Sequence, residues 1–177
     1  MGKKKNAPEG GPATPATVAL DRAGLTYQAH PYIHDPASEL SYGLEAAAAL
    51  GVPPEVVFKT LVAKVDGLRG AQGLAVAVLP VTATLDLKAL AQALGCKKAA
   101  IAEPAAAERS SGYVTGGISP IGQRTTLPTV IDSSAEQLER VYVSGGRRGF
   151  DISLAPTDLI AVADAQVAPI ARPGCCR

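Results

Sequence analysis

The sequence lacks tryptophan, and aromatic residues make up only 4% of its 177 residues. Alanine, valine, leucine and isoleucine must therefore fill the core, and a hydrophobic content of 47% suffices for one folded domain. No apolar run reaches the roughly 18 residues of a membrane-spanning helix, and the start, MGKKKN, lacks the apolar segment of a signal peptide. We therefore expect a cytoplasmic protein with no membrane partner.

Cysteine and net charge are also scarce. Of three cysteines, Cys175 and Cys176 are adjacent, which predicts a reduced protein without a disulfide framework. A net charge of +1 provides no overall positive field for nucleic acid. An RNA ligand is still compatible with this composition, because a local basic patch is enough to bind one.

The motifs of common enzyme chemistry are missing. There is no Gly-x-Ser-x-Gly elbow, and Ile118 stands where a phosphate-binding loop needs lysine. Cys96 follows a predicted helix end, where the helix dipole disfavours a thiolate. His30 and His34 flank Pro31, which favours a strand and separates them by about 13 Å, too far to share a metal. We expect no metal and no cofactor, and the support for a nucleophile of the protein's own is weak.

Caps and periodicity predict alternating helices and strands. Helices are expected between Thr14 and Gly24, in YGLEAAAALG, in LDLKALAQALG, between Glu103 and Gly112, and in APTDLIAVAD. Strands are expected in LTYQAHPYIHD, VVFKTLVAKVDG, GLAVAVLP, PTVIDSS, RVYVSGG and FDISLA, with a hairpin between the second and third of these. Ser133 and Glu136 form a candidate capping box.

These elements mix without a regular βαβ rhythm, so the fold class is predicted to be α+β. Residues 1–13 contain glycine, proline and lysine without periodicity and are expected to be a flexible tail. We expect a single domain over residues 14–171, followed by a C-terminal tail at 172–177.

Lys59 is the most informative single residue. In the strand VVFKTLVAKV it shares a face with four apolar side chains, Val57, Leu61, Ala63 and Val65. One interpretation is an edge lysine that extends its ammonium to water. The other is an ammonium presented inside a pocket, positioned for an anion or a carbonyl group.

Two glycine-rich stretches, GGISPIGQR at 116–124 and SGGRRGFD at 144–151, allow two interpretations as well. Such stretches are usually turns. Alternatively, their backbone N–H groups approach a ligand closely, where they bind a carbonyl, carboxylate or phosphate oxygen without titrating. Arg147 and Arg148, within the second stretch, suit a partner that carries phosphate.

Four segments together, VFKTLV, LAVAVLPVTATLDLKALAQALG, SSGYVTGGISPIGQR and YVSGGRRGFDISLAPTDL, resemble the YbaK family. Its members are free-standing relatives of the editing domain inserted in bacterial prolyl-tRNA synthetase. The similarity extends from about Tyr27 to about Ile170. It implies a mixed, barrel-like β-sheet surrounded by helices, and removal of a wrongly attached amino acid from tRNA.

The branch that this sequence most resembles clears cysteine from tRNA(Pro) and from Cys-tRNA(Cys). There the thiol of the substrate is thought to attack its own ester and expel the tRNA, so the activity is that of a hydrolase or, with cyclisation, a lyase. The partner implied is the 3′ acceptor end of aminoacyl-tRNA, with prolyl-tRNA synthetase as a further candidate. The resemblance places the catalytic lysine at Lys59. The other implied site residues, all substrate-binding, are Tyr32, Tyr42, Gly116, Gly117, Ile118, Ser119, Pro120 and Asp151, with Arg147 and Arg148 as candidate tRNA contacts.

Two alternatives stay open on the sequence. One is a deacylase for alanine or serine attached to tRNA, because related members clear other residues. The other is a non-catalytic module that binds tRNA or a synthetase. Lys59, the two glycine stretches and Asp151 argue against binding alone.

Overall fold

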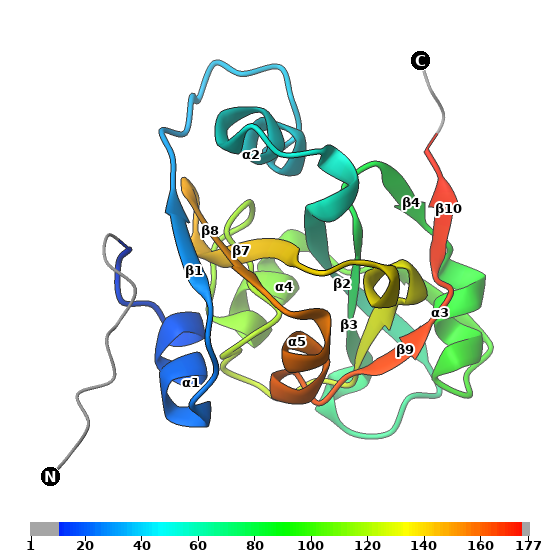
Figure 1. Cartoon of the computed structure of the whole chain (residues 1–177). Helices are drawn as coiled ribbons and strands as arrows, with labels where there is room; N and C mark the ends of the chain where they lie inside the picture. Colours follow the sequence, from blue (N-terminus) through cyan, green and yellow to red (C-terminus); the bar gives the residue numbers. More distant parts are fainter. Residues whose placement is uncertain (1–10, 175–177) are drawn as a thin grey trace, which may run out of the picture.

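The computed structural model describes residues 11–174. Most of the expected N-terminal tail, and both Cys175 and Cys176, lie outside these residues. No helix among the described residues is long and apolar enough to cross a membrane. Figure 1 shows strands in the middle of the molecule, with helices α1 and α5 below them, α2 above and α3 at one side.

Three sheets make up the β-structure. A five-stranded sheet has the order β5-β2-β3-β6-β9, a three-stranded sheet has the order β1-β8-β7, and β10 pairs with β4. β2, β3 and β5 pair antiparallel, whereas β6 lies parallel to β3 and to β9. The predicted α+β class with a mixed sheet is confirmed, and the strands of residues 11–174 form no closed barrel. The strands are β1 (Gln28–Pro31), β2 (Phe58–Asp66), β3 (Leu74–Pro80), β4 (Ala83–Leu85), β5 (Lys98–Ile101), β6 (Thr129–Asp132), β7 (Val141–Arg147), β8 (Phe150–Leu154), β9 (Gln166–Ala168) and β10 (Ala171–Pro173).

All the helices expected from caps are present. Thr14 caps the first by accepting a hydrogen bond from the Thr17 N–H, and Gly24 ends it in the left-handed conformation. The α-helices are α1 (Pro15–Ala23), α2 (Tyr42–Leu50), α3 (Leu87–Ala93), α4 (Pro104–Ser111) and α5 (Pro156–Val162), and the 3₁₀ helices are η1 (Pro54–Val56), η2 (Ala71–Gly73) and η3 (Ser133–Gln137).

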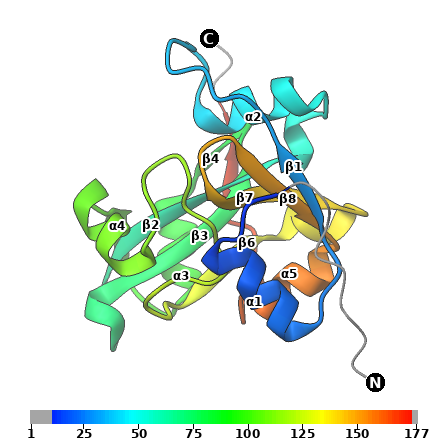
Figure 2. The same ribbon diagram turned by 90° about the vertical axis from the view of Figure 1, so that its left-hand side faces the viewer.

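Strand β3 is buried on both faces and separates two cores. Val76 and Val78 face a larger core that includes residues of α1, α5 and the three-stranded sheet. Ala75, Ala77 and Leu79 face a smaller core that includes α3 residues. Figures 1 and 2 show α1 and α5 side by side against the larger core. The prediction of a central strand from the continuous apolar run GLAVAVLP is therefore confirmed.

Pairing at the C-terminal end continues further than the sequence indicates. Ala171, Arg172 and Pro173 pair antiparallel with β4. The boundary expected after residue 171 therefore lies inside a strand. Strands as short as β4, β5, β9 and β10 carry too few residues for a period of two to stand out, which is why the sequence analysis did not predict them.

Asp132, at the end of β6, is a buried junction between distant segments. Its Oδ1 accepts hydrogen bonds from the N–H groups of Ile170 and Ala171, both at 2.9 Å. Its Oδ2 accepts one from the Ser134 N–H at 3.1 Å. The predicted capping box of Ser133 and Glu136 is wrong, because Asp132 occupies the N-cap instead and η3 is a 3₁₀ helix.

We expect Asp132→Ala to lower the free energy of unfolding by about 3 kcal/mol or more, because several N–H groups would lose their acceptor in a buried place. Urea denaturation measures this difference. Glu136→Ala, an exposed change in the same 3₁₀ helix, is the control and should have little effect. A loss for Asp132→Ala as small as that of the control would contradict the role of this junction.

Candidate active site

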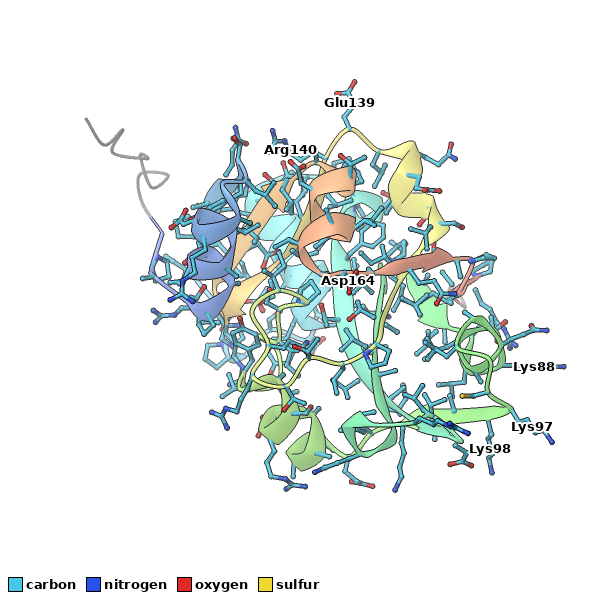
Figure 3. All side chains as sticks on the ribbon, turned by 90° about the horizontal axis from the view of Figure 1, so that it is seen from below. Lys88, Lys97, Lys98, Glu139, Arg140 and Asp164 are labelled. Carbon is cyan, nitrogen blue, oxygen red and sulfur yellow. The ribbon has the colours of Figure 1, made fainter. Side chains whose placement is uncertain are left out.

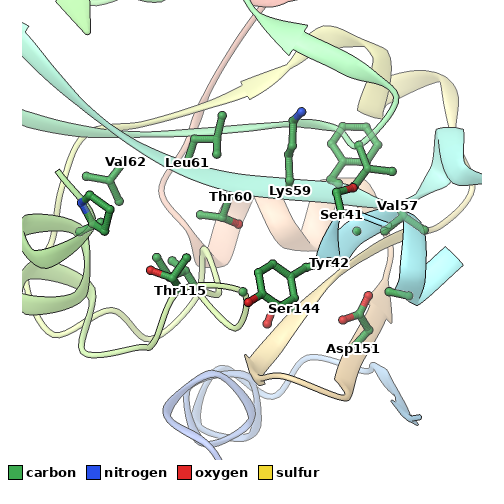
Figure 4. Close-up of a pocket in the computed structure, with 18 of the residues that line it drawn as sticks. Ser41, Tyr42, Val57, Lys59, Thr60, Leu61, Val62, Thr115, Ser144 and Asp151 are labelled. Atoms are coloured by element: carbon green, nitrogen blue, oxygen red, sulfur yellow. The ribbon is translucent and has the colours of Figure 1, made fainter. Parts of the chain in front are cut away.

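An enclosed pocket lies beside the first half of β2, where β5 does not pair with it. α2, α4 and the loop after α4 enclose it, together with the paired strands β7 and β8. Its walls are mainly apolar, and polar groups enter from several elements (Figure 4). These polar or glycine positions are Tyr32, Ser41, Tyr42, Gly43, Lys59, Thr60, Thr115, Gly116, Ser144 and Asp151.

Tyr42, the first residue of α2, covers the pocket through contacts on several sides. Its ring lies so close to Gly116 that a Cβ there would be 2.7 Å from it. The Arg148 guanidinium lies 5.2 Å from the ring centroid, within the range of a cation–π contact. The His34 ring lies 5.6 Å away and is tilted by 41°. Gly116 also has a positive φ of 86°, so both its conformation and this packing exclude a side chain.

The segment before α2 is tied to that helix by a buried carboxylate. Glu45 accepts a hydrogen bond from the Asp35 N–H at 2.7 Å, and His34 Nδ1 lies 2.9 Å from its Oε2. His30 is engaged elsewhere, with Nε2 2.7 Å from Ser153 Oγ. The two histidines thus have separate partners, and residues 11–174 contain no cluster of three metal-ligating side chains.

Arg148 connects the second glycine stretch to the loop after α4. Its Nε donates to the Thr115 carbonyl at 2.9 Å. Glu108 of α4 fixes the same residue from the other side, accepting from the Thr115 N–H at 2.8 Å. Arg148, expected as a tRNA contact, is therefore held against the loop beside the pocket, and both Arg147 and Arg148 are exposed.

The glycine loop contributes to the pocket at only some of its positions. Gly116 and Ile118 line it, and neither of their N–H groups has a partner among the described residues. Gly117 instead contacts the neighbouring turn, where a Cβ would lie 2.8 Å from Arg147 Cα. Ser119 and Pro120 are buried behind the loop and do not line the pocket. The loop therefore offers two free backbone donors.

Asp151 is buried in the pocket wall, opposite Ser144 in the pairing of β7 and β8. Burial raises the pKa of its carboxyl from 3.8 to about 7. Burial, with a smaller contribution from the nearby Asp151 charge, raises the pKa of Tyr32 to about 12. The two residues form the most strongly perturbed titrating pair of the pocket, which is typical of a functional site.

Lys59 leaves β2 on the side opposite Thr60, Tyr42 and Asp151 (Figure 4). Its Nζ donates to the Ala83 carbonyl at 2.6 Å, and burial lowers its pKa. The expected face with Ala63 and Val65 is present and belongs to the smaller core. The structure therefore does not bring the ammonium beside Asp151 or the glycine loop, although the side chain borders the pocket.

Four polar residues of the pocket were not identified from the sequence: Ser41, Thr60, Thr115 and Ser144. Hydroxyl side chains at strand and loop positions are common, so composition carries no signal for them. The alternation of side chains along β2 does provide a signal for Thr60, because consecutive residues of a strand face opposite sides and Thr60 therefore faces away from Lys59. Ser144 is predictable only once the register with Asp151 is known.

Comparisons with known proteins show to which family the chain belongs. Residues 40–162 match the family model described as an aminoacyl-tRNA editing domain. The chain is 39% identical over 124 residues to an Enterococcus faecalis protein named "Putative Cys-tRNA(Pro)/Cys-tRNA(Cys) deacylase EbsC", covering 70% of this chain and 73% of that protein. The chain belongs to the aminoacyl-tRNA editing domain family, a family of aminoacyl-tRNA deacylases. The resemblance to the YbaK family is thereby confirmed.

Solved structures agree with this assignment. A structure titled "Crystal structure of a putative trans-editing enzyme for prolyl tRNA synthetase" has a TM-score of 0.76 and 25% identity, covering 89% of this chain and 95% of that one. The hypothetical protein APE2540 has a TM-score of 0.77 and 24% identity, covering 90% and 100% of the two chains, and supports the fold.

The raised pKa of Asp151 predicts a pH-dependent stability. The folded state holds this proton more tightly than the unfolded state, so stability present below about pH 4 is lost as the pH rises through about 7. Asp151→Asn removes this loss. We expect the variant to become more stable than the unmodified protein above pH 7, by up to about 4 kcal/mol. Urea denaturation at pH 5 and pH 8.5 measures the change.

Glu139→Gln, at an exposed tip far from the core, is the matched control and should behave as the unmodified protein at both pH values (Figure 3). If the difference between Asp151→Asn and the unmodified protein stays the same at pH 5 and 8.5, the Asp151 carboxyl is ionised in the fold and the argument from burial is wrong.

Proposed function

We propose that this protein removes cysteine from mischarged tRNA(Pro) and from Cys-tRNA(Cys), acting in trans on the 3′ acceptor end in the cytoplasm. The relationship to EbsC, whose name includes both substrates, supports cysteine as the amino acid. The family supplies the reaction class, which is cleavage of an aminoacyl ester.

One observation carries the mechanism: the pocket holds free backbone donors but no activated nucleophile. Among the described residues, the serine–histidine contact of Ser153 and His30 uses a fully buried serine and lies outside the pocket. Cys96 packs against the smaller core and does not line the pocket either. The attacking atom is therefore assigned to the substrate.

The reaction then proceeds within the aminoacyl group. The cysteine sulfur forms a bond to its own carbonyl carbon, the ester C–O bond breaks, and the thiol proton goes to the departing ribose oxygen. The product is a four-membered cyclic thioester, which water opens to free cysteine. The N–H groups of Gly116 and Ile118 hold the carbonyl oxygen while negative charge develops on it. Orientation of thiol and carbonyl supplies the rest of the rate enhancement.

Asp151 is assigned to the α-amino group of the substrate. Its carboxyl titrates near neutral pH because burial penalises the charge, and a bound ammonium would offset that penalty. Tyr32 lies near enough to sense the Asp151 charge, so it borders the same end of the pocket.

Lys59 is assigned to the nucleotide. Its ammonium lies across β2 from Asp151 and reaches the edge near Ala83, away from the ester position. A cation there suits a phosphate of the acceptor end, and the exposed Arg147 supplies a second charge.

The mechanism predicts which amino acids are cleaved. Purified protein should deacylate cysteinyl-tRNA(Pro) faster than seryl-tRNA(Pro) by roughly tenfold or more, because a hydroxyl is the poorer nucleophile near neutral pH. Single-turnover cleavage, with binding measured separately, gives the comparison. Equal rates for cysteine and serine would favour a protein-activated water, and preference for alanyl-tRNA(Pro) would favour an alanine deacylase. Binding without cleavage of any substrate would identify a non-catalytic module.

Lys59→Ala should weaken binding of aminoacyl-tRNA. It should also reduce the steepness of the plot of log binding constant against log salt concentration by about one. Binding titrations at several salt concentrations measure the slope. Lys64→Ala removes an exposed lysine from the same strand and should leave the slope unchanged. If Lys59→Ala keeps the slope of the unmodified protein, the phosphate assignment is wrong.

A further inference from the structure

One buried hydroxyl in the pocket has no partner. Among residues 11–174, Thr60 Oγ1 is the buried side-chain nitrogen or oxygen for which no hydrogen bond is found. Figure 4 shows its side chain on the same side of β2 as Tyr42 and Thr115, opposite Lys59 and Leu61. An unsatisfied buried hydroxyl costs roughly 1–3 kcal/mol, so folded proteins keep few of them. The position of this one, in a substrate pocket, suggests that its partner is the ligand.

The edge of β2 that faces β5 has no strand partner at Thr60. Strand β5 pairs with β2 only from Ala63 onward, and the Ala102 N–H donates to the Val62 carbonyl at 2.9 Å. Because backbone direction alternates along a strand, Thr60 directs its own N–H and C=O toward the edge that Val62 uses. No strand lies in register beside Thr60 there. The pocket therefore borders an end of β2 whose edge no strand covers.

The surrounding groups indicate which part of the ligand meets the hydroxyl. Phe58 and Val62 flank Thr60 on this side of the strand and are apolar. Gly116 and Ile118 line the same pocket with free N–H groups, which donate and cannot accept. A hydroxyl that can also donate completes a set suited to one acceptor oxygen. An ester carbonyl is such an oxygen.

We propose that Thr60 Oγ1 donates a hydrogen bond to the carbonyl oxygen of the aminoacyl ester, together with the N–H groups of Gly116 and Ile118. This inference rests on the proposed function. It makes Thr60 a catalytic residue of the reaction, because the charge on that oxygen grows as the ester is attacked.

Thr60→Val keeps the shape of the side chain and removes the hydroxyl. We expect kcat of deacylation to fall by on the order of a hundredfold with little change in KM, as for loss of one oxyanion donor. The melting temperature should not fall, because the substitution removes an unsatisfied polar group. Thr60→Ser should restore most of the rate. Loss of activity without loss of stability separates this role from a structural one.

The matched control is Thr129→Val. Thr129 is also buried, but its hydroxyl donates to the Leu127 carbonyl at 3.1 Å. This variant should lose stability and keep its rate per folded molecule. If the unmodified protein deacylates cysteinyl-tRNA and Thr60→Val does so at the same kcat, the role of Thr60 is wrong and the proposed function stands. If the unmodified protein cleaves no aminoacyl-tRNA, both are overturned.

Discussion

Bare backbone at the contact of two loops is the constraint on which the pocket depends. Gly117 of the first glycine stretch lies against the backbone of Arg147 in the second, so closely that any Cβ would overlap it. This contact lets Arg148 reach the Thr115 carbonyl and lie over Tyr42. A side chain at Gly117 would separate the loops and loosen the pocket without touching a substrate. The two glycine stretches are thus one structural unit.

The cover of the pocket depends on a second set of contacts, which begins in α2. Buried Glu45 holds the His34 side chain and the Asp35 N–H, and so fixes the chain that enters the helix. Tyr42 then packs between His34 and Gly116. Its ring covers the pocket only while both neighbours are in place. The polar contacts of Glu45 therefore help to hold an aromatic ring in position. The pocket is thus preorganised by contacts among its own residues.

Local signals in the sequence predict local structure well and spatial relationships less well. Thr14 and Gly24 bound α1 because capping chemistry acts within a few residues. Asp132 takes the N-cap of η3 by accepting from the Ser134 N–H, and the sequence does not reveal its other partners, Ile170 and Ala171, 38 and 39 residues away. The pocket residues Tyr32 and Asp151 followed from resemblance to a family, since only the folded chain brings β1 and β8 together.

Lys59 shows how a correct local pattern can support an incomplete picture of a site. Its apolar face was identified correctly, yet that face belongs to the smaller core, and the pocket opens at the strand edge between the two faces. Because consecutive side chains on a strand point to opposite sides, a lysine and a threonine at 59 and 60 cannot both face the ester. The strand therefore presents the two groups on opposite sides: the ammonium meets the Ala83 carbonyl on one side, and the threonine hydroxyl lies on the other. In the mechanism proposed above, this two-residue sequence supplies a charge for the nucleotide and a neutral donor for the reacting group, from one fixed backbone.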